Sequence, residues 1–268
     1  MNAHCARPAF PIVHLSLVLS VVVIAGAYGA SDEECRLSSE HGHMTFPVDQ
    51  LESVSRCLLA DVIDHPSASG VIGPNQTPIG IDLYGYLLDH PVLTAKLMQR
   101  MGLGPVQIVE KGPSRYWVND GDGAEGLLFL IFRDSRRRIY YIDGEHRSTL
   151  FPTIRAKTAV FLQIATGPET SGGSSVHTTL ASYTRFEKSI LSRLMQFFQP
   201  LVTQAVNRTL AKEFSMTHRL GILIAEQPQR ILEEAAALSG ASPDDRHTLL
   251  ALLRAEVAVS HSSADASP

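Results

Sequence analysis

The sequence carries no excess of positive charge and none of the common catalytic motifs. Its 23 Lys and Arg residues are outnumbered by 27 Asp and Glu residues, for a formal net charge of −4. This balance excludes the basic footprint of a nucleic-acid-binding protein at the level of the whole chain. The patterns G-x-S-x-G, H-E-x-x-H and the P-loop are absent, so no standard nucleophile, zinc or phosphate site is indicated. We therefore predict no catalytic residue and no cofactor.

The N-terminal end of the chain predicts export. Arg7 is the only charged side chain before Asp32, residues 12–24 form a dense apolar run, and small residues follow from Ala25 to Ala30. This pattern is typical of a secretory signal peptide, here over residues 1–27. An uncleaved membrane anchor is the alternative, although the dense run is short for a span. No cysteine directly follows the run, which disfavours a bacterial lipoprotein.

Cysteine is rare, with three residues in the chain. Cys5 lies in the predicted signal peptide, which leaves Cys35 and Cys57 as an even pair in an oxidising compartment. A disulfide between them would stabilise the fold by about 3 kcal/mol on the chain-entropy account. Two free or buried thiols are the other interpretation, and the spacing alone does not decide between them.

The first part of the mature chain predicts helices around a loop. Residues 46–64 carry apolar side chains at helical spacing. Residues 65–80 are rich in Pro, Gly and Ser, which predicts a loop. A pair of helices follows as far as Gly104, with Pro91 starting the second helix and Asp89 as its N-cap. An acid–base pair formed by Asp89 and the next residue is the alternative to capping.

From Val106 to Thr184 the sequence period becomes that of strands. Short β-like runs are joined by turns, among them Asp120–Gly123 and Arg133–Arg136. Because consecutive runs are joined by short turns, they predict an antiparallel meander of roughly five to seven strands rather than a parallel sheet. The run Leu127–Phe132 is apolar at every position, so both faces of that strand need a cover.

The helical period returns after the meander. Residues 186–214 predict a long amphipathic helix with a kink at Pro200. A helical extension over residues 215–259 and a frayed tail over residues 260–268 are expected next. The fold class is α+β: a curved antiparallel sheet grips the long kinked helix, with further helices at both ends of the chain.

This order of elements resembles the START-like, helix-grip family of hydrophobic-ligand-binding proteins, also described as polyketide cyclase-like (SRPBCC-type). The resemblance covers residues 81–214: the helix pair in DLYGYLLDHPVLTAKLMQRMG, the strands from Val106 to Thr184, and RLMQFFQPLVTQAVNRTLAKEF as the gripping helix. It consists of the order and length of elements, and the helices after Phe214 depart from the minimal family plan. The resemblance implies a cavity between sheet and helix that takes a lipid, sterol or other apolar molecule. Some members are enzymes, but no catalytic residue carries over to this chain.

Aromatic side chains of the meander are the candidate ligand-binding residues. Aromatic rings, some with a polar handle, suit the wall of a pocket, and they also suit an ordinary core. Adjacent residues of a strand point to opposite faces, so one of each adjacent pair at most lines a cavity. The predicted lining is Trp117, Phe129, Tyr140, Phe161 and Tyr183.

Other polar groups favour structural interpretations. His41, His43 and His65 lack a recognised zinc spacing, so no metal site is predicted. The Asp120–Gly123 segment lacks the remaining ligands of a calcium loop and fits a turn. The run Arg136–Arg138 has two interpretations: contact with anionic lipid headgroups, or a solvated turn that protects a sheet edge from pairing.

Three functions remain open, ranked in this order. The first is an exported, periplasmic or secreted, binding or carrier protein for a lipid or other apolar small molecule. The second is a cyclase- or hydrolase-type enzyme that uses the same cavity, with Glu145, His146 and Arg147 as candidate groups. The third is a cell-envelope interaction protein with an exposed apolar patch on its C-terminal helices. The sequence does not identify the ligand or the oligomeric state.

Overall fold

The computed structural model describes residues 35–147, 153–167, 175–187, 212 and 215–264. The chain divides into two compact units, Met1–Glu33 and Glu34–Pro268. The predicted signal peptide falls in the first unit and lies outside the described residues. The predicted gripping helix, residues 186–214, also lies almost wholly outside them. Phe186 itself is the last residue of a strand, so no helix begins there.

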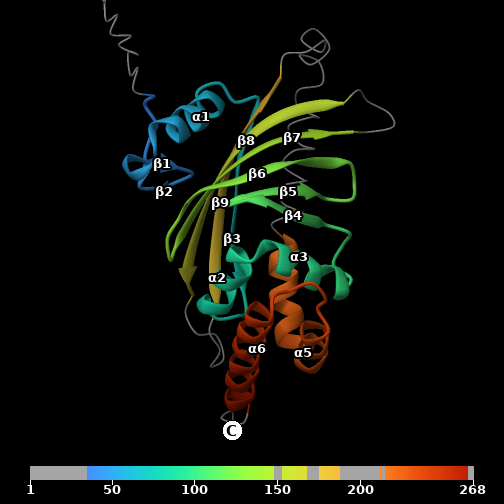
Figure 1. The fold of residues 1–268 in the computed structure, drawn as a ribbon. Helices are drawn as coiled ribbons and strands as arrows, with labels where there is room; N and C mark the ends of the chain where they lie inside the picture. The colour runs from blue at the N-terminus through green and yellow to red at the C-terminus, as the bar shows by residue number, and fades with distance from the viewer. Residues whose placement is uncertain (1–34, 148–152, 168–174, 188–211, 213–214, 265–268) are drawn as a thin grey trace, which may run out of the picture. The chain divides into compact units, whose positions relative to one another are not determined.

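A seven-stranded antiparallel sheet forms the centre of the second unit (Figure 1). Its strands stand in the order β3-β9-β8-β7-β6-β5-β4, and every neighbouring pair is antiparallel. The strands are β3 (Ala68–Thr77), β4 (Gln107–Gly112), β5 (Arg115–Asn119), β6 (Ala124–Arg133), β7 (Arg137–His146), β8 (Ile154–Thr166) and β9 (Val176–Phe186). The predicted meander and the α+β fold class are confirmed.

Strand β3 corrects the prediction that residues 65–80 form a loop. It is an edge strand that pairs with β9, and its register shifts between Ile72 and Asn75. The cis peptide bond Gly73–Pro74 lies in this shift. Proline has no N–H to donate, so it is tolerated at sheet edges and at bulges. A Pro- and Gly-containing edge strand therefore has the composition of a loop.

The observed helices agree in most details with those predicted from the sequence. They are α1 (Ser53–Ile63), α2 (Ile81–Asp89), α3 (Pro91–Arg100), α5 (Pro228–Ala236) and α6 (Pro243–Ala264), and residues 215–226 are also helical. Pro91 starts α3 as predicted, but the cap prediction is wrong: Asp89 ends α2, and the residue in the N-cap position of α3 is His90. Helix α6 continues to Ala264, into the segment expected to be a frayed tail. None of the helices that the structure describes has the length and apolarity needed to cross a membrane.

The two faces of the sheet pack against different parts of the chain. We call the face that carries Tyr140 the inner face and the face that carries Tyr141 the outer face. Residues directly opposite each other on neighbouring strands share a face. The outer face packs under the N-terminal segment, in a core of Met44, Phe46, Val48, Leu51, Leu59, Val62, Ile139, Tyr141, Ala159, Phe161 and Ala181. A short hairpin, β1 (Glu40–His41) with β2 (Met44–Thr45), and a turn of 3₁₀ helix at Val48–Gln50 belong to this segment.

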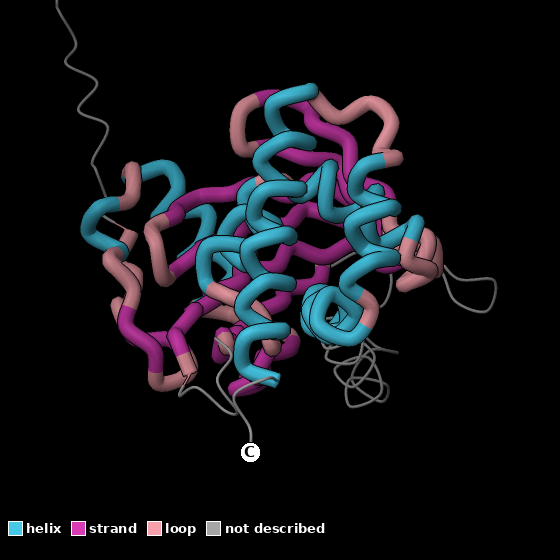
Figure 2. Tube along the Cα trace, turned by 90° about the horizontal axis from the view of Figure 1, so that it is seen from below, coloured by secondary structure: helices cyan, strands magenta, loops and turns pink. Residues whose placement is uncertain are grey.

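The inner face packs under the helices that follow β3 and those near the C-terminus. Its core includes Leu83, Leu87, Leu97, Leu220, Ile224, Ile231, Leu249 and Leu253 from the helices, with Val160, Leu162, Ile164 and Leu180 from the sheet. Figures 1 and 2 show α2, α3, α5 and α6 gathered at one end of the sheet. The apolar strand β6 thus has partners on both sides: Phe129 and Ile131 pack on the outer core, while Leu128 and Leu130 face inward.

Cys35 and Cys57 form a disulfide, with Cα atoms 5.0 Å apart. The bond ties the start of the described chain to α1, so the segment that covers the outer face is closed into a loop. Of the two interpretations that the spacing left open, the structure has the disulfide.

Strands β6 and β7 approach each other closely at Gly126 and Gly144, which are directly opposite in register. A Cβ atom on Gly126 would lie 2.5 Å from Gly144 Cα and 2.6 Å from the carbonyl oxygen of Asp143. Real Cβ atoms do not come this close to backbone, so only glycine fits here.

Candidate functional site

The inner face is closed over β8 and β9 but half-open over β5–β7. Val160, Leu162 and Leu180 are buried beneath the helices. The inner-facing side chains of the next three strands are only half-buried, although two of these strands lie in the middle of the sheet: Tyr116, Val118, Leu128, Leu130, Tyr140 and Ile142. We call this set the β5–β7 inner surface. It is mainly apolar, which makes it the candidate site for an apolar ligand.

Tyr140 places a hydroxyl group at this surface. Burial raises the pKa of Tyr140, and the nearby Arg138 cation opposes the rise only in part. The hydroxyl group therefore stays protonated at neutral pH and can donate a hydrogen bond. Among the residues that the structure describes, none hydrogen-bonds to it.

Several other hydroxyl groups on the inner side of the sheet have partners. Burial raises the pKa of Tyr84 on α2 to about 12, and a hydrogen bond with the Thr178 side chain opposes the rise. The hydroxyl groups of Thr158 and Thr184 lie 2.9 Å apart and bond to each other. Since no described residue bonds to the hydroxyl group of Tyr140, this group can bond to a ligand or to water.

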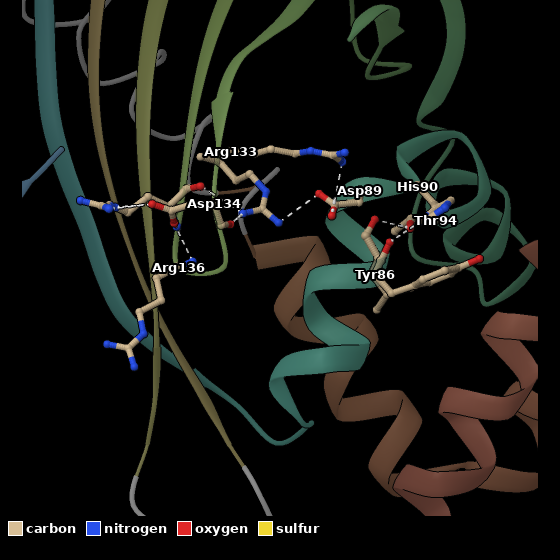
Figure 3. A network of polar contacts seen from close by, with 10 residues as sticks. Tyr86, Asp89, His90, Thr94, Arg133, Asp134 and Arg136 are labelled. Carbon is tan, nitrogen blue, oxygen red and sulfur yellow. Dashed lines mark hydrogen bonds and ion pairs between the residues drawn. The ribbon is translucent and has the colours of Figure 1, made fainter. Parts of the chain in front are cut away.

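An ion pair between a buried arginine and a half-buried aspartate stands at the α2 end of the same surface. Figure 3 shows Asp89, the acidic member, at the end of α2. The Arg138 side chain is 4% exposed, and its Nη2 donates a hydrogen bond to Asp89 Oδ1 over 3.0 Å. Its Nη1 donates to the carbonyl oxygens of Asp134 and Arg137. Arg133, which is largely exposed, approaches the other oxygen of Asp89 at 3.5 Å. Two arginines thus share one carboxylate, which leaves a local excess of positive charge.

Helix α6 holds α2 in place behind this pair. The backbone N–H of Gly80, at the N-terminus of α2, donates to a Glu256 carboxylate oxygen over 2.9 Å. Near the other end, the hydroxyl group of Tyr86 donates to the carbonyl oxygen of Asp245 over 2.8 Å. His90 stacks on the Tyr86 ring, with centroids 3.9 Å apart. Figure 3 shows Tyr86, Asp89 and His90 together at the end of α2.

The structure separates the five predicted lining residues. Tyr140 alone faces inward; the other four share the outer face, as the register shows: Trp117, Phe129, Phe161 and Tyr183. The five therefore do not surround one common pocket. A ligand contact at any of them remains a prediction.

Phe161 and Tyr183 take part in an aromatic cluster of the outer core. Phe161 is fully buried and stacks on His41 with ring centroids 3.8 Å apart, while Phe46 meets it edge-on. The Tyr183 hydroxyl group lies 3.3 Å from His41 Nδ1. These contacts account for both rings as core packing.

Ion pairs account for two members of the arginine run, and contact with anionic lipid headgroups stays a prediction. Arg137 pairs with Asp134 and Arg138 pairs with Asp89, so in the described chain Arg136 alone of the three has no ion pair. The turn joins β6 to β7 in the middle of the sheet rather than at an edge. The sequence did contain a signal for Arg138: it stands two residues before Tyr140, and alternate residues of a strand share a face.

The candidate catalytic groups do not converge. Glu145 pairs with Arg147 at 2.5 Å and with Arg155 at 3.3 Å, while His146 and Arg147 are exposed. Glu145 is in register with the outer face, away from the β5–β7 inner surface. Within the described parts of the chain, no group of three or more His, Cys, Asp or Glu residues is arranged to hold a metal ion.

No family model matches the sequence, and no curated protein matches it. Several solved structures are similar. A conserved protein from Geobacillus kaustophilus is 8% identical with a TM-score of 0.41, over 57% of this chain and 93% of that one. The di-domain ARO/CYC protein BexL is 14% identical with a TM-score of 0.40, over 65% of this chain and 56% of that one. Norcoclaurine synthase from Thalictrum flavum is 14% identical with a TM-score of 0.35, over 57% of this chain and 93% of that one. At these TM-scores the likeness is too distant to carry an argument about function.

Proposed function

We propose that this protein binds an apolar small molecule against the β5–β7 inner surface. The observation that carries the proposal is the half-open, mainly apolar inner side of strands that lie within the sheet. Apolar surface of this kind gains free energy when a ligand removes it from water.

Export is part of the same proposal. The predicted signal peptide favours it, and the Cys35–Cys57 disulfide supports it because such bonds persist in oxidising compartments. A periplasmic or secreted carrier of an apolar molecule is the role that fits these features together.

The interaction-protein alternative has lost its main support. It expected an exposed apolar patch on the C-terminal helices. Ile231, Leu249 and Leu253 of these helices are fully buried in the inner core. The enzyme alternative likewise lacks convergent ionisable groups at its three named candidates.

The adjacent residues Leu127 and Leu128 provide a matched test, because they face opposite sides of β6. N-Phenyl-1-naphthylamine, a neutral apolar fluorescent probe, would be titrated into the protein and into Leu128→Trp and Leu127→Trp variants. We expect Leu128→Trp to weaken binding about tenfold or more by filling the surface, while Leu127→Trp binds as the parent does. Thermal unfolding of both variants checks that they fold. Absence of probe binding to the parent, or equal loss in the two variants, would refute the proposal.

A further inference from the structure

We infer that the ligand is an apolar molecule that ends in a carboxylate, and that this carboxylate accepts a hydrogen bond from the Tyr140 hydroxyl group beside Arg138. This inference rests on the proposed function and specifies the chemical class of the ligand. It draws on three features of the inner face: an unbonded donor, the sign of the charge near it, and the change from polar to apolar along β7.

The donor is the first feature. Tyr140 is protonated at neutral pH, its side chain is half-buried, and no described residue bonds to its hydroxyl group. A protonated tyrosine hydroxyl group is a hydrogen-bond donor. Since no described neighbour accepts its hydrogen bond, an acceptor on the ligand can do so. Hydrogen bonds to a charged acceptor are about twice as strong as those to a neutral one.

The sign of the charge favours an anion at this position. Among the charges that act on the Tyr140 hydroxyl group, the Arg138 cation has a larger effect than Asp89. Arg133 adds a second cation to the pair, at 3.5 Å from Asp89. Tyr116, one strand further on, differs: there the Glu110 carboxylate is the strongest of the acting charges. Two arginines thus stand against one carboxylate beside Tyr140, and this arrangement favours an anionic ligand group over a cationic one there.

The polarity changes along β7 in the direction that an amphipathic ligand needs. Arg138, Tyr140, Ile142 and Gly144 follow one another on the inner face. Charge comes first, then a hydroxyl group, then an aliphatic side chain, and then a glycine, which adds no polar side chain. At about 3.3 Å per residue, Tyr140 and Gly144 are about 13 Å apart along the strand. A carboxylate at Tyr140 would thus direct a medium-length apolar tail toward Gly144.

Three probes with the same tail test the inference: decanoate, decanol and decylamine, each titrated into the whole protein by calorimetry at neutral pH. We expect decanoate to bind about tenfold tighter than decanol, and decylamine to bind most weakly, because of the added charge-assisted hydrogen bond. The variant Tyr140→Phe keeps the ring and removes the hydroxyl group, so it should reduce the preference for decanoate over decanol toward unity. Tyr141→Phe is the matched control, since it removes a hydroxyl group from the adjacent residue on the outer face and should keep the preference.

The outcomes separate the inference from the proposed function. If decanol binds as tightly as decanoate, the carboxylate inference is wrong and the apolar-ligand proposal stands. If the preference for decanoate survives in Tyr140→Phe, the carboxylate does not lie at Tyr140 and the inference fails. If neither these probes nor N-phenyl-1-naphthylamine bind the parent protein, both the inference and the proposed function fail.

Discussion

The guanidinium group of Arg138, buried near the start of β7, donates a hydrogen bond to the carboxylate of Asp89, the last residue of α2, over 3.0 Å. The two residues are 49 positions apart in the chain. This pair joins the sheet to the helices that close one end of it. It also fixes the charge that acts on Tyr140.

Removing the carboxylate should destabilise the protein strongly. In Asp89→Asn the buried Arg138 loses its countercharge. Because the Asp89 side chain is 28% exposed, we expect a loss of about 1.5–3 kcal/mol, the range for a hydrogen bond to a charged group. The free energy of unfolding from urea titrations measures the loss. The control is Glu145→Gln, which breaks exposed pairs with Arg147 and Arg155 and should have a far smaller effect. Equal losses in the two variants would contradict the role of burial.

The disulfide should contribute measurable stability. The double variant Cys35→Ser, Cys57→Ser opens a loop with a sequence separation of 22, and it should lose about 3 kcal/mol on the chain-entropy account. Urea titrations with and without dithiothreitol check this. The reductant should destabilise the parent and leave the double variant unchanged. A parent that is insensitive to complete reduction would oppose the prediction.

Acid should weaken the outer core through His41. This side chain is 1% exposed, and burial lowers its pKa, although a hydrogen bond with the Ser38 backbone opposes the shift. The unfolded chain therefore binds the proton more tightly than the folded protein, so stability falls as the pH drops below about 6.5 and levels off below the folded pKa.

The midpoint of urea unfolding, measured from about pH 7.5 to pH 5, tests this role of His41. His41→Phe keeps an aromatic ring against Phe161 and should reduce the pH dependence. His43→Gln changes an exposed histidine two residues away and should retain the dependence of the parent. A pH profile that His41→Phe leaves unchanged would remove His41 as its source.

Substitution by alanine should change the stability of the protein in opposite directions at two glycines. A Cβ at Gly126 would meet the backbone of β7, so Gly126→Ala should destabilise the fold by more than about 1 kcal/mol. Gly85 lies within α2 with open space around it, and Gly85→Ala should stabilise by about 0.5–1 kcal/mol through helix propensity. Thermal unfolding of both variants decides the point. Stabilisation by Gly126→Ala would show that the strands can separate there.

The order of helices and strands followed from the sequence because local signals marked it. Strand and helix periods, Pro91 at a helix start and the turn at Asp120–Gly123 are all short-range features. Strand β3 was not predicted because its pairing with β9 is a long-range contact. Its Gly73–Pro74 segment also has the composition of a turn. The disulfide needed the same kind of information, since spacing alone does not bring Cys35 and Cys57 together.

The candidate site was harder to predict than the fold. Alternation showed that Tyr140 and Tyr141 face opposite sides, but which side the helices cover depends on contacts across the whole chain. As a result four of the five aromatic predictions lie on the outer face. The sequence did not predict the pairing of Arg138, because its partner Asp89 is far away in sequence and only the folded chain brings the two together.

The bonds from Gly80 and Tyr86 to α6 have a consequence for how the chain tolerates shortening. The C-terminal helix braces α2 from behind at Glu256 and Asp245, so residues far along the chain decide where the Asp89 carboxylate stands. A truncated protein that ended before Pro243 would retain every strand of the sheet and still lose this brace. Helix α6 thus supports the candidate site through its contacts with α2, although the strands alone carry the β5–β7 inner surface.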